Sequence, residues 1–122
     1  MPWLLVFLGG GLGSLCRYAI SRLLPLAELA EGDIPWATLL ANALACLLLG
    51  VLLALLAKEQ LPKELSFLLV TGFCGGFSTF STFSAELLSL LEAGHYGAAL
   101  TYAAISLFTG LVAIWVTLLW LR

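Results

Sequence analysis

The stretch Gly72–Ser84, GFCGGFSTFSTFS, is the part of the sequence most informative about the fold. Its first half carries three glycines, and its second half repeats Phe-Ser-Thr at a three-residue step inside an otherwise apolar segment. Glycines followed by Ser78 and Thr79 predict a break with non-helical backbone over Gly72–Thr79. A simple glycine kink that serves packing is the alternative interpretation.

The segment around this stretch is one of four long apolar segments. The chain has 122 residues, of which 62% are hydrophobic and only 10% charged, and a soluble domain of this length needs far more charge on its surface. A transmembrane helix needs about 20 mostly apolar residues. Four segments meet this requirement, at residues 3–24, 35–57, 65–91 and 97–121. We therefore expect a single all-α membrane domain, residues 1–122, whose third helix is broken. The first segment lacks the basic start of a signal peptide and is expected to be retained.

The few charges bear on topology and partners. The net charge of −2 and the lack of a basic surface argue against a nucleic-acid partner. With four spans, three basic residues fall on one side of the membrane and one or two on the other. Basic loop residues set orientation, so this weak bias would allow insertion both ways round and an antiparallel homodimer. Each of the three cysteines lies in a different span and reads as a small buried hydrophobe.

A break at Gly72–Thr79 would expose two helix ends inside the membrane. Irregular backbone is tolerated there only where protein or a polar cavity covers it. The carbonyls that end the first half suit a cation, and the N–H groups that start the second half suit an anion. Beyond the break, Phe80 and Phe83 share a face beside rows of hydroxyls. Ring edges carry positive potential, so the face could hold a small anion; a phenylalanine zipper between helices is the alternative.

The other spans carry isolated polar residues. Arg17 lies several residues inside the first span, where a cation is either buried or facing a vestibule, or reaches to the interface. In the second span Thr38, Asn42 and Cys46 share a face. Asn42 either forms an interhelical hydrogen bond worth about 1 kcal/mol or lines a pathway. In the fourth span Tyr102, Ser106 and Thr109 form a stripe of hydroxyls.

Glycines of the first span are expected to pack against another helix. Gly9 and Gly13, and likewise Gly10 and Ser14, are four residues apart, which lets two backbones approach closely. This is a packing interpretation with no functional residue in it.

Three motifs together resemble the small fluoride-channel family known as Fluc or CrcB. They are GGGLGSLCRY in the first span, Asn42 in the second, and GFCGGFSTFSTFSAE in the third. The resemblance covers essentially the whole chain. It implies an antiparallel, dual-topology homodimer in the bacterial inner membrane that exports cytoplasmic fluoride passively down its gradient. It also implies that the chain is a channel and no enzyme.

The same resemblance assigns residues. It implies a structural sodium ion at the dimer centre, held by the backbone carbonyls of Gly75 and Ser78 from both subunits. The implied fluoride pathway contains Asn42, Phe80, Phe83, Ser81, Thr82, Tyr102 and Ser106. Arg17 and Glu86 match a family arginine and a family acid, and with Thr38 they are candidates for a vestibule or structural role.

Two other classes of membrane protein fit the chain less well. A proton-coupled multidrug transporter of similar size needs a carboxylate embedded in the membrane, and Glu86 is the one candidate within a span. A non-transporting subunit packing through its glycine face would leave the hydroxyl rows unexplained. His95, in the short third loop, is expected to be solvated.

Overall fold

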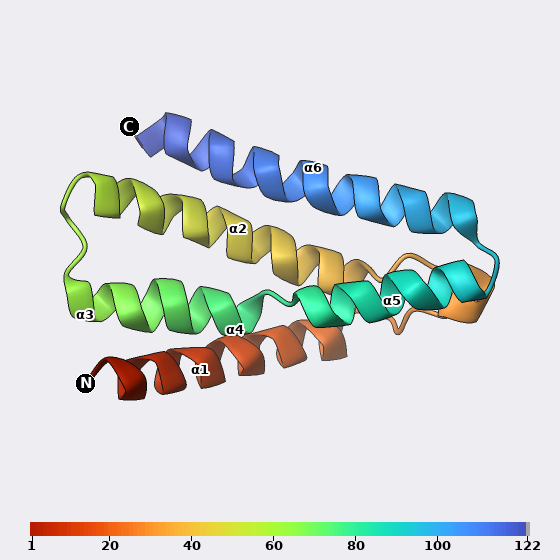
Figure 1. Cartoon of the computed structure of the whole chain (residues 1–122), viewed down its shortest axis with the longest axis horizontal. Coiled ribbons are helices and arrows are strands. Elements are labelled where there is room, and N and C mark those ends of the chain that lie inside the picture. The colour runs from red at the N-terminus through yellow and green to blue at the C-terminus, as the bar shows by residue number, and fades with distance from the viewer. Residues whose placement is uncertain (122) are drawn as a thin grey trace.

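The computed structural model describes residues 1–121 as a bundle of helices (Figure 1). Four helical segments are long and apolar enough to cross a membrane: α1 (Pro2–Leu23), α2 (Trp36–Ala57), a third span (Lys63–Glu92) and α6 (Tyr96–Leu121). Their ends lie within two residues of those predicted from hydropathy. The chain is therefore an all-helical protein with the architecture of a multi-pass membrane protein.

The third span is built from several pieces. They are α3 (Lys63–Ser66), the π-helix η2 (Phe67–Cys74), α4 (Gly75–Phe77) and α5 (Phe80–Glu92). Between α4 and α5, Ser78 (φ −84°, ψ 154°) and Thr79 (φ −149°, ψ 117°) are extended. Figure 1 shows these two residues, called the interruption below, as a thin link between α4 and α5.

The glycines of the third span are helical, contrary to the prediction that Gly72–Thr79 as a whole is non-helical. Gly72 lies within η2, and Gly75 has helical angles (φ −63°, ψ −38°). The physical role of Gly72 and Gly76 is close approach to α1 instead of backbone freedom. A methyl group on Gly76 would overlap the Gly10 carbonyl of α1, and one on Gly72 would lie 3.0 Å from the Gly9 Cα.

The glycine face of α1 completes this contact and confirms the packing interpretation. A methyl group on Gly9 would overlap the Leu68 carbonyl, and one on Gly13 would overlap the Phe73 carbonyl. Gly11, on another face of α1, has open space around it. Small residues that let backbones touch are the usual basis of helix packing in membranes, where apolar side chains gain little by leaving lipid.

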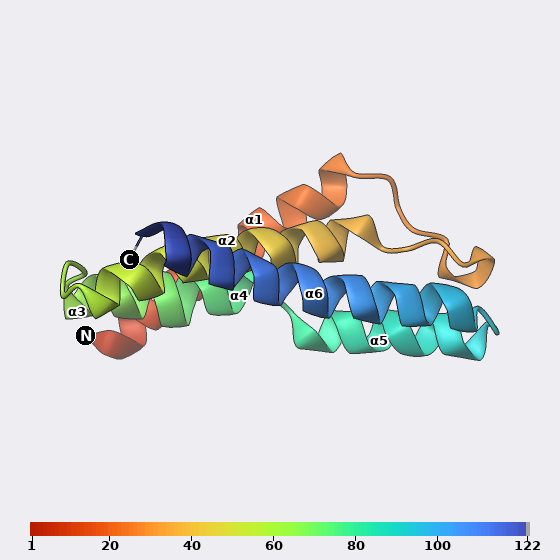
Figure 2. The same cartoon turned by 90° about the horizontal axis from the view of Figure 1, so that it is seen from above.

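The helices lie one beside the next in the order α6, α2, third span, α1 (Figure 1). Both termini lie at the same end as the α2–α3 connection. At the opposite end α5 packs against α6 (Figure 2). The core there consists of Leu39, Leu90, Ala99 and Tyr102, and Leu29 and Ile34 from the first connection pack against it.

The first connection is folded over this end of the bundle. It contains the short 3₁₀ helix η1 (Leu29–Glu31), which ends at Gly32 in the left-handed region (φ 84°). A nitrogen of the His95 ring, Nε2, lies 2.8 Å from the Ala30 carbonyl oxygen. His95 therefore joins the first and third connections, in addition to being accessible to solvent as predicted.

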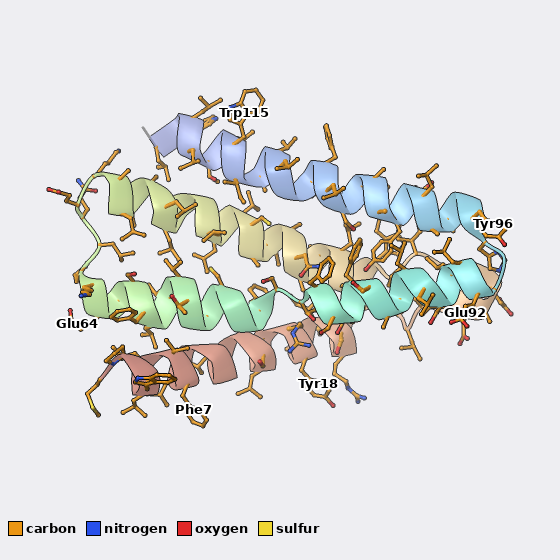
Figure 3. The ribbon with its side chains drawn as sticks, in the orientation of Figure 1. Phe7, Tyr18, Glu64, Glu92, Tyr96 and Trp115 are labelled. Atoms are coloured by element: carbon orange, nitrogen blue, oxygen red, sulfur yellow. The ribbon has the colours of Figure 1, made fainter. Side chains whose placement is uncertain are left out.

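The outer surface of the bundle is strongly apolar. Figure 3 shows Phe7, Tyr18 and Trp115 pointing away from the bundle, and all three are mostly exposed. Glu64 and Glu92 lie at opposite ends of the third span. Apolar sides with charges at the ends suit a protein surrounded by lipid.

Candidate functional site

The interruption is held by the side chain of Asn42. The Thr79 N–H, which would donate to the Gly75 carbonyl if the helix continued, donates instead to Asn42 Oδ1 at 2.9 Å. The Asn42 amide nitrogen lies 3.5 Å from the Thr79 carbonyl oxygen. Asn42 is thus both an interhelical hydrogen-bonding residue and, as described below, part of a cavity wall, so the two interpretations of this residue are compatible.

The two helix ends at the interruption are capped by their own hydroxyls. The N–H and the hydroxyl of Ser78 both donate to the Cys74 carbonyl, at 3.0 and 2.8 Å. Thr79 is the N-cap of α5, where its hydroxyl oxygen accepts the Thr82 N–H at 3.2 Å. Ser and Thr are favoured at such ends because a side-chain oxygen replaces the missing backbone partner.

Arg17 contacts the backbone at the end of the first half of the third span. Its Nε–H donates to the Gly76 carbonyl at 3.2 Å, and the side chain is partly buried. Arg17 is thus half-buried and bonded to the backbone of the third span, and it also lines the smaller cavity described below. The Arg17 guanidinium therefore contacts α4. Arg17 itself follows Gly13, which packs against the Phe73 carbonyl, by one turn of α1.

A cavity of about 380 Å³ lies between α2, the interruption, α5 and α6. Its wall contains four of the predicted pathway residues and three other hydroxyl residues: Asn42, Phe80, Phe83 and Ser106, with Ser78, Thr79 and Thr109. The hydroxyl oxygen of Ser106 is buried and has no hydrogen-bond partner among residues 1–121. Leu39, Leu107 and Ile114 supply apolar wall. The cavity thus offers a few donors in apolar surroundings.

A second, smaller cavity of about 130 Å³ lies on the other side of the interruption. It is lined by Arg17, Tyr18, Ser21, Ala37, Thr38, Thr79 and Thr82. Thr82 therefore faces Arg17 and Thr38 and does not line the larger cavity. Ser81 lines neither cavity; it is exposed, and its hydroxyl lies 3.3 Å from the Thr79 hydroxyl. The predicted row of pathway hydroxyls is thus divided in this single chain.

Tyr102 lies behind the wall of the larger cavity. It is fully buried, and its hydroxyl donates to Glu86 Oε1 at 3.0 Å. Its ring centroid lies 5.0 Å from that of Phe83, which in turn lies 6.1 Å from that of Phe80. Tyr102 therefore supports Phe83 from the side of α6, and its hydroxyl is already bonded to a carboxylate.

Cys46, Thr79 and Thr109 are among the lining residues that were not predicted as site residues. Cys46 and Thr109 line the larger cavity, and Thr79 lines both cavities. The signals for the first two were present, because Cys46 lies one turn after Asn42 and Thr109 continues the hydroxyl stripe of Ser106. Thr79 could have been found as a threonine directly before a helix start.

The backbone carbonyls of Gly75 and Ser78, the sodium ligands expected from the sequence, lie on either side of the end of α4. Among the described residues there is no group of three or more His, Cys, Asp or Glu side chains that could hold a metal ion. Gly75 is exposed, and a Cβ added to it would meet open space. Its carbonyl does not accept the Thr79 N–H, because that group donates to Asn42.

Comparison with known proteins gives one consistent result. Residues 4–118 match the family model described as CrcB-like protein, Camphor Resistance (CrcB). A fluoride-specific ion channel FluC of Thermus thermophilus is 48% identical over 109 residues, which cover 89% of this chain and 86% of the relative. A protein of the same name from Phocaeicola vulgatus is 39% identical over 111 residues, covering 91% and 90%. Another from Pyrococcus abyssi is 50% identical over 94 residues, covering 76% and 73%.

Proposed function

This chain belongs to the CrcB family, and from that premise we propose that it is a fluoride-selective channel of the cell inner membrane. Cytoplasmic fluoride would leave through it passively, down the electrochemical gradient, which limits fluoride toxicity. Its relatives carry the name of fluoride-specific ion channel.

The observation that carries the proposal is the unpaired Ser106 hydroxyl in the larger cavity. A buried hydroxyl without a partner costs free energy, so a ligand that accepts its hydrogen bond would be favoured there. Asn42 also lines this cavity, as do Phe80 and Phe83, whose ring edges carry positive potential. Such donors can replace the water shell of fluoride while each holds it weakly enough for release.

The geometry of Phe80 supports a second copy of the chain as partner. Phe80 lines the larger cavity, yet 79% of its surface is exposed. The wall that it contributes is therefore incomplete in a single chain. An antiparallel homodimer would supply the missing wall, and the weak charge bias between the two membrane sides is compatible with it.

A structural sodium ion fits the backbone at the interruption. The carbonyls of Gly75 and Ser78 would be the ligands, two from each chain, and the open surroundings of Gly75 leave room for the partner. A bound cation would neutralise the carbonyl dipoles that converge at the C-terminal end of α4. Replacing sodium by N-methylglucamine should abolish fluoride flux; undiminished flux would contradict the sodium site.

Anion efflux from liposomes that contain the purified protein tests the channel function. Fluoride should leave rapidly without a proton gradient, whereas chloride should stay inside. Equal efflux of the two anions would contradict selectivity. A requirement for a proton gradient would favour a coupled carrier that uses Glu86 as its membrane carboxylate.

Replacement of Phe80 tests the proposed pathway. Phe80→Ile should abolish fluoride efflux because it removes the ring edge from the cavity wall, while the protein should still fold because Phe80 is exposed. Phe7→Ile is the matched control, since Phe7 is 74% exposed and points outward from α1 (Figure 3). Normal flux in Phe80→Ile would show that this ring does not line the pathway.

A further inference from the structure

We propose that Arg17 is a positioning residue that caps the end of α4 and so fixes the carbonyls of the candidate cation site. The involvement of a cation rests on the proposed function above. The cap itself rests on the contact between the Arg17 Nε–H and the Gly76 carbonyl.

The interruption leaves a defined set of backbone carbonyls without helical partners. In a continuous helix the carbonyls of Gly75 and Gly76 would accept the N–H groups of Thr79 and Phe80. The Thr79 N–H donates to Asn42 instead, and Gly76 accepts from Arg17. Gly75 therefore keeps a carbonyl free for a ligand, while the carbonyl next to it is held by a side chain.

The position of Arg17 follows from the backbone packing of α1. Gly13 lies directly against the Phe73 carbonyl, and a methyl group on Gly13 would come within 2.8 Å of the Phe77 N atom. Arg17 follows Gly13 by four residues, or about one helical turn. It therefore reaches the Gly76 carbonyl from a helix whose register cannot shift without a backbone clash.

The electrostatics of the contact account for a cation within a membrane span. The C-terminal end of a helix carries partial negative charge, and a charge-assisted hydrogen bond to a carbonyl is stronger than a neutral one. Arg17 has further N–H donors beyond Nε. They belong to a side chain that also lines the smaller cavity with Thr79 and Thr82. The residue thus contacts the end of α4 and lies beside the start of α5.

This arrangement predicts that Arg17 lowers the entropic cost of cation binding. Without the cap, the last turn of α4 would fray, and an incoming sodium ion would have to order Gly75–Ser78 by itself. The Ser78 N–H, which donates to Cys74, reports on that turn directly.

Hydrogen exchange at the interruption, measured in sodium-free buffer, tests the cap without any flux. Arg17→Met keeps the aliphatic stem but removes the donor and the charge. We expect exchange of the peptide over residues 74–79 to accelerate about tenfold, the size expected for the loss of one charge-assisted hydrogen bond. Arg17→Gln, whose amide nitrogen takes the place of Nε, should restore most of the protection. Arg22→Met is the matched control, because Arg22 is exposed on the same helix.

Sodium titration of fluoride efflux provides the second readout. Arg17→Met should raise the sodium concentration for half-maximal efflux about tenfold, and saturating sodium should restore both flux and protection. Wild-type exchange in Arg17→Met would overturn the cap, whatever the flux. Altered exchange with unchanged sodium dependence would overturn the link to the cation site. A wild-type protein without fluoride flux would contradict the channel function but leave the exchange result valid.

Discussion

The two halves of the third span are packed by different means. The first half, residues 63–77, meets α1 backbone to backbone through glycines on both helices. The second half, α5, meets α6 and the first connection through large side chains, with Leu90 and Tyr102 completely buried between them. One half has its register set by backbone atoms, and the other by interlocking side chains.

This difference matches what each half contributes to the site. The first half presents backbone carbonyls, whose positions are useful only if the backbone is fixed. The second half presents the side chains of Phe80, Phe83 and Thr82, whose rotamers can adjust. Fixed backbone suits a structural cation, and adjustable side chains suit an ion that has to enter and leave.

Adding a methyl group to a glycine that contacts α1 should cause the largest loss in the free energy of unfolding. Gly76→Ala would drive a Cβ into the Gly10 carbonyl, which cannot move without shifting α1. We expect a loss of about 3 kcal/mol in the free energy of unfolding in detergent, at the upper end of the usual cost of overpacking. Gly11→Ala is the control, since Gly11 has open space around it. Equal stability of the two variants would mean that backbone contact does not fix the first half.

Truncation in the side-chain core of the second half should have a smaller effect. Leu90→Ala removes a completely buried side chain that packs with Leu39 and Tyr102. The neighbouring side chains can partly close the space, so we expect a loss of about 2 kcal/mol in the free energy of unfolding. Leu88→Ala, on the exposed side of the same helix, should be close to neutral. A loss for Leu90→Ala greater than that for Gly76→Ala would mean that the second half of the third span is packed more rigidly than the first.

Removal of the Tyr102 hydroxyl should have the smallest effect on stability. Tyr102→Phe keeps the ring against Phe83 but deletes the hydrogen bond to Glu86. We expect a loss of about 1 kcal/mol in the free energy of unfolding. Flux should fall only modestly, because the hydroxyl is bonded to the carboxylate and lies outside the wall of the larger cavity. Tyr96→Phe, exposed on the same helix, is the control. Complete loss of flux in Tyr102→Phe would mean that the hydroxyl serves the ion directly.

The sequence predicted the four spans, and four of the predicted pathway residues meet at the larger cavity: Asn42, Phe80, Phe83 and Ser106. Apolar length is a local property, so the span ends could be read directly. Asn42 and Ser106 stood out because a polar group in hydrocarbon needs a partner. Asn42, Ser106, Phe80 and Phe83 line the same cavity. This could be predicted from the helix face that each residue occupies.

Other features could not be read from the sequence because they depend on which helix a residue faces. Gly72 and Gly76 suggested loose backbone, but they contact α1 as helical residues. Ser81 and Thr82 were predicted to line one pathway with Phe80 and Phe83. The extended residues Ser78 and Thr79 set the rotation of α5 relative to α4, and that rotation turns Thr82 toward Arg17.

The glycine contact also determines when the protein can assemble during its synthesis. Arg17 precedes Gly76 by 59 residues, so α1 enters the bilayer before its packing partner has been translated. Until then the glycine face of α1 has no helix to pack against, and Arg17 lacks the Gly76 carbonyl that it later binds. The packing of α1 therefore has to wait for the third span, and the helix that is made first is among the last to reach its final neighbours.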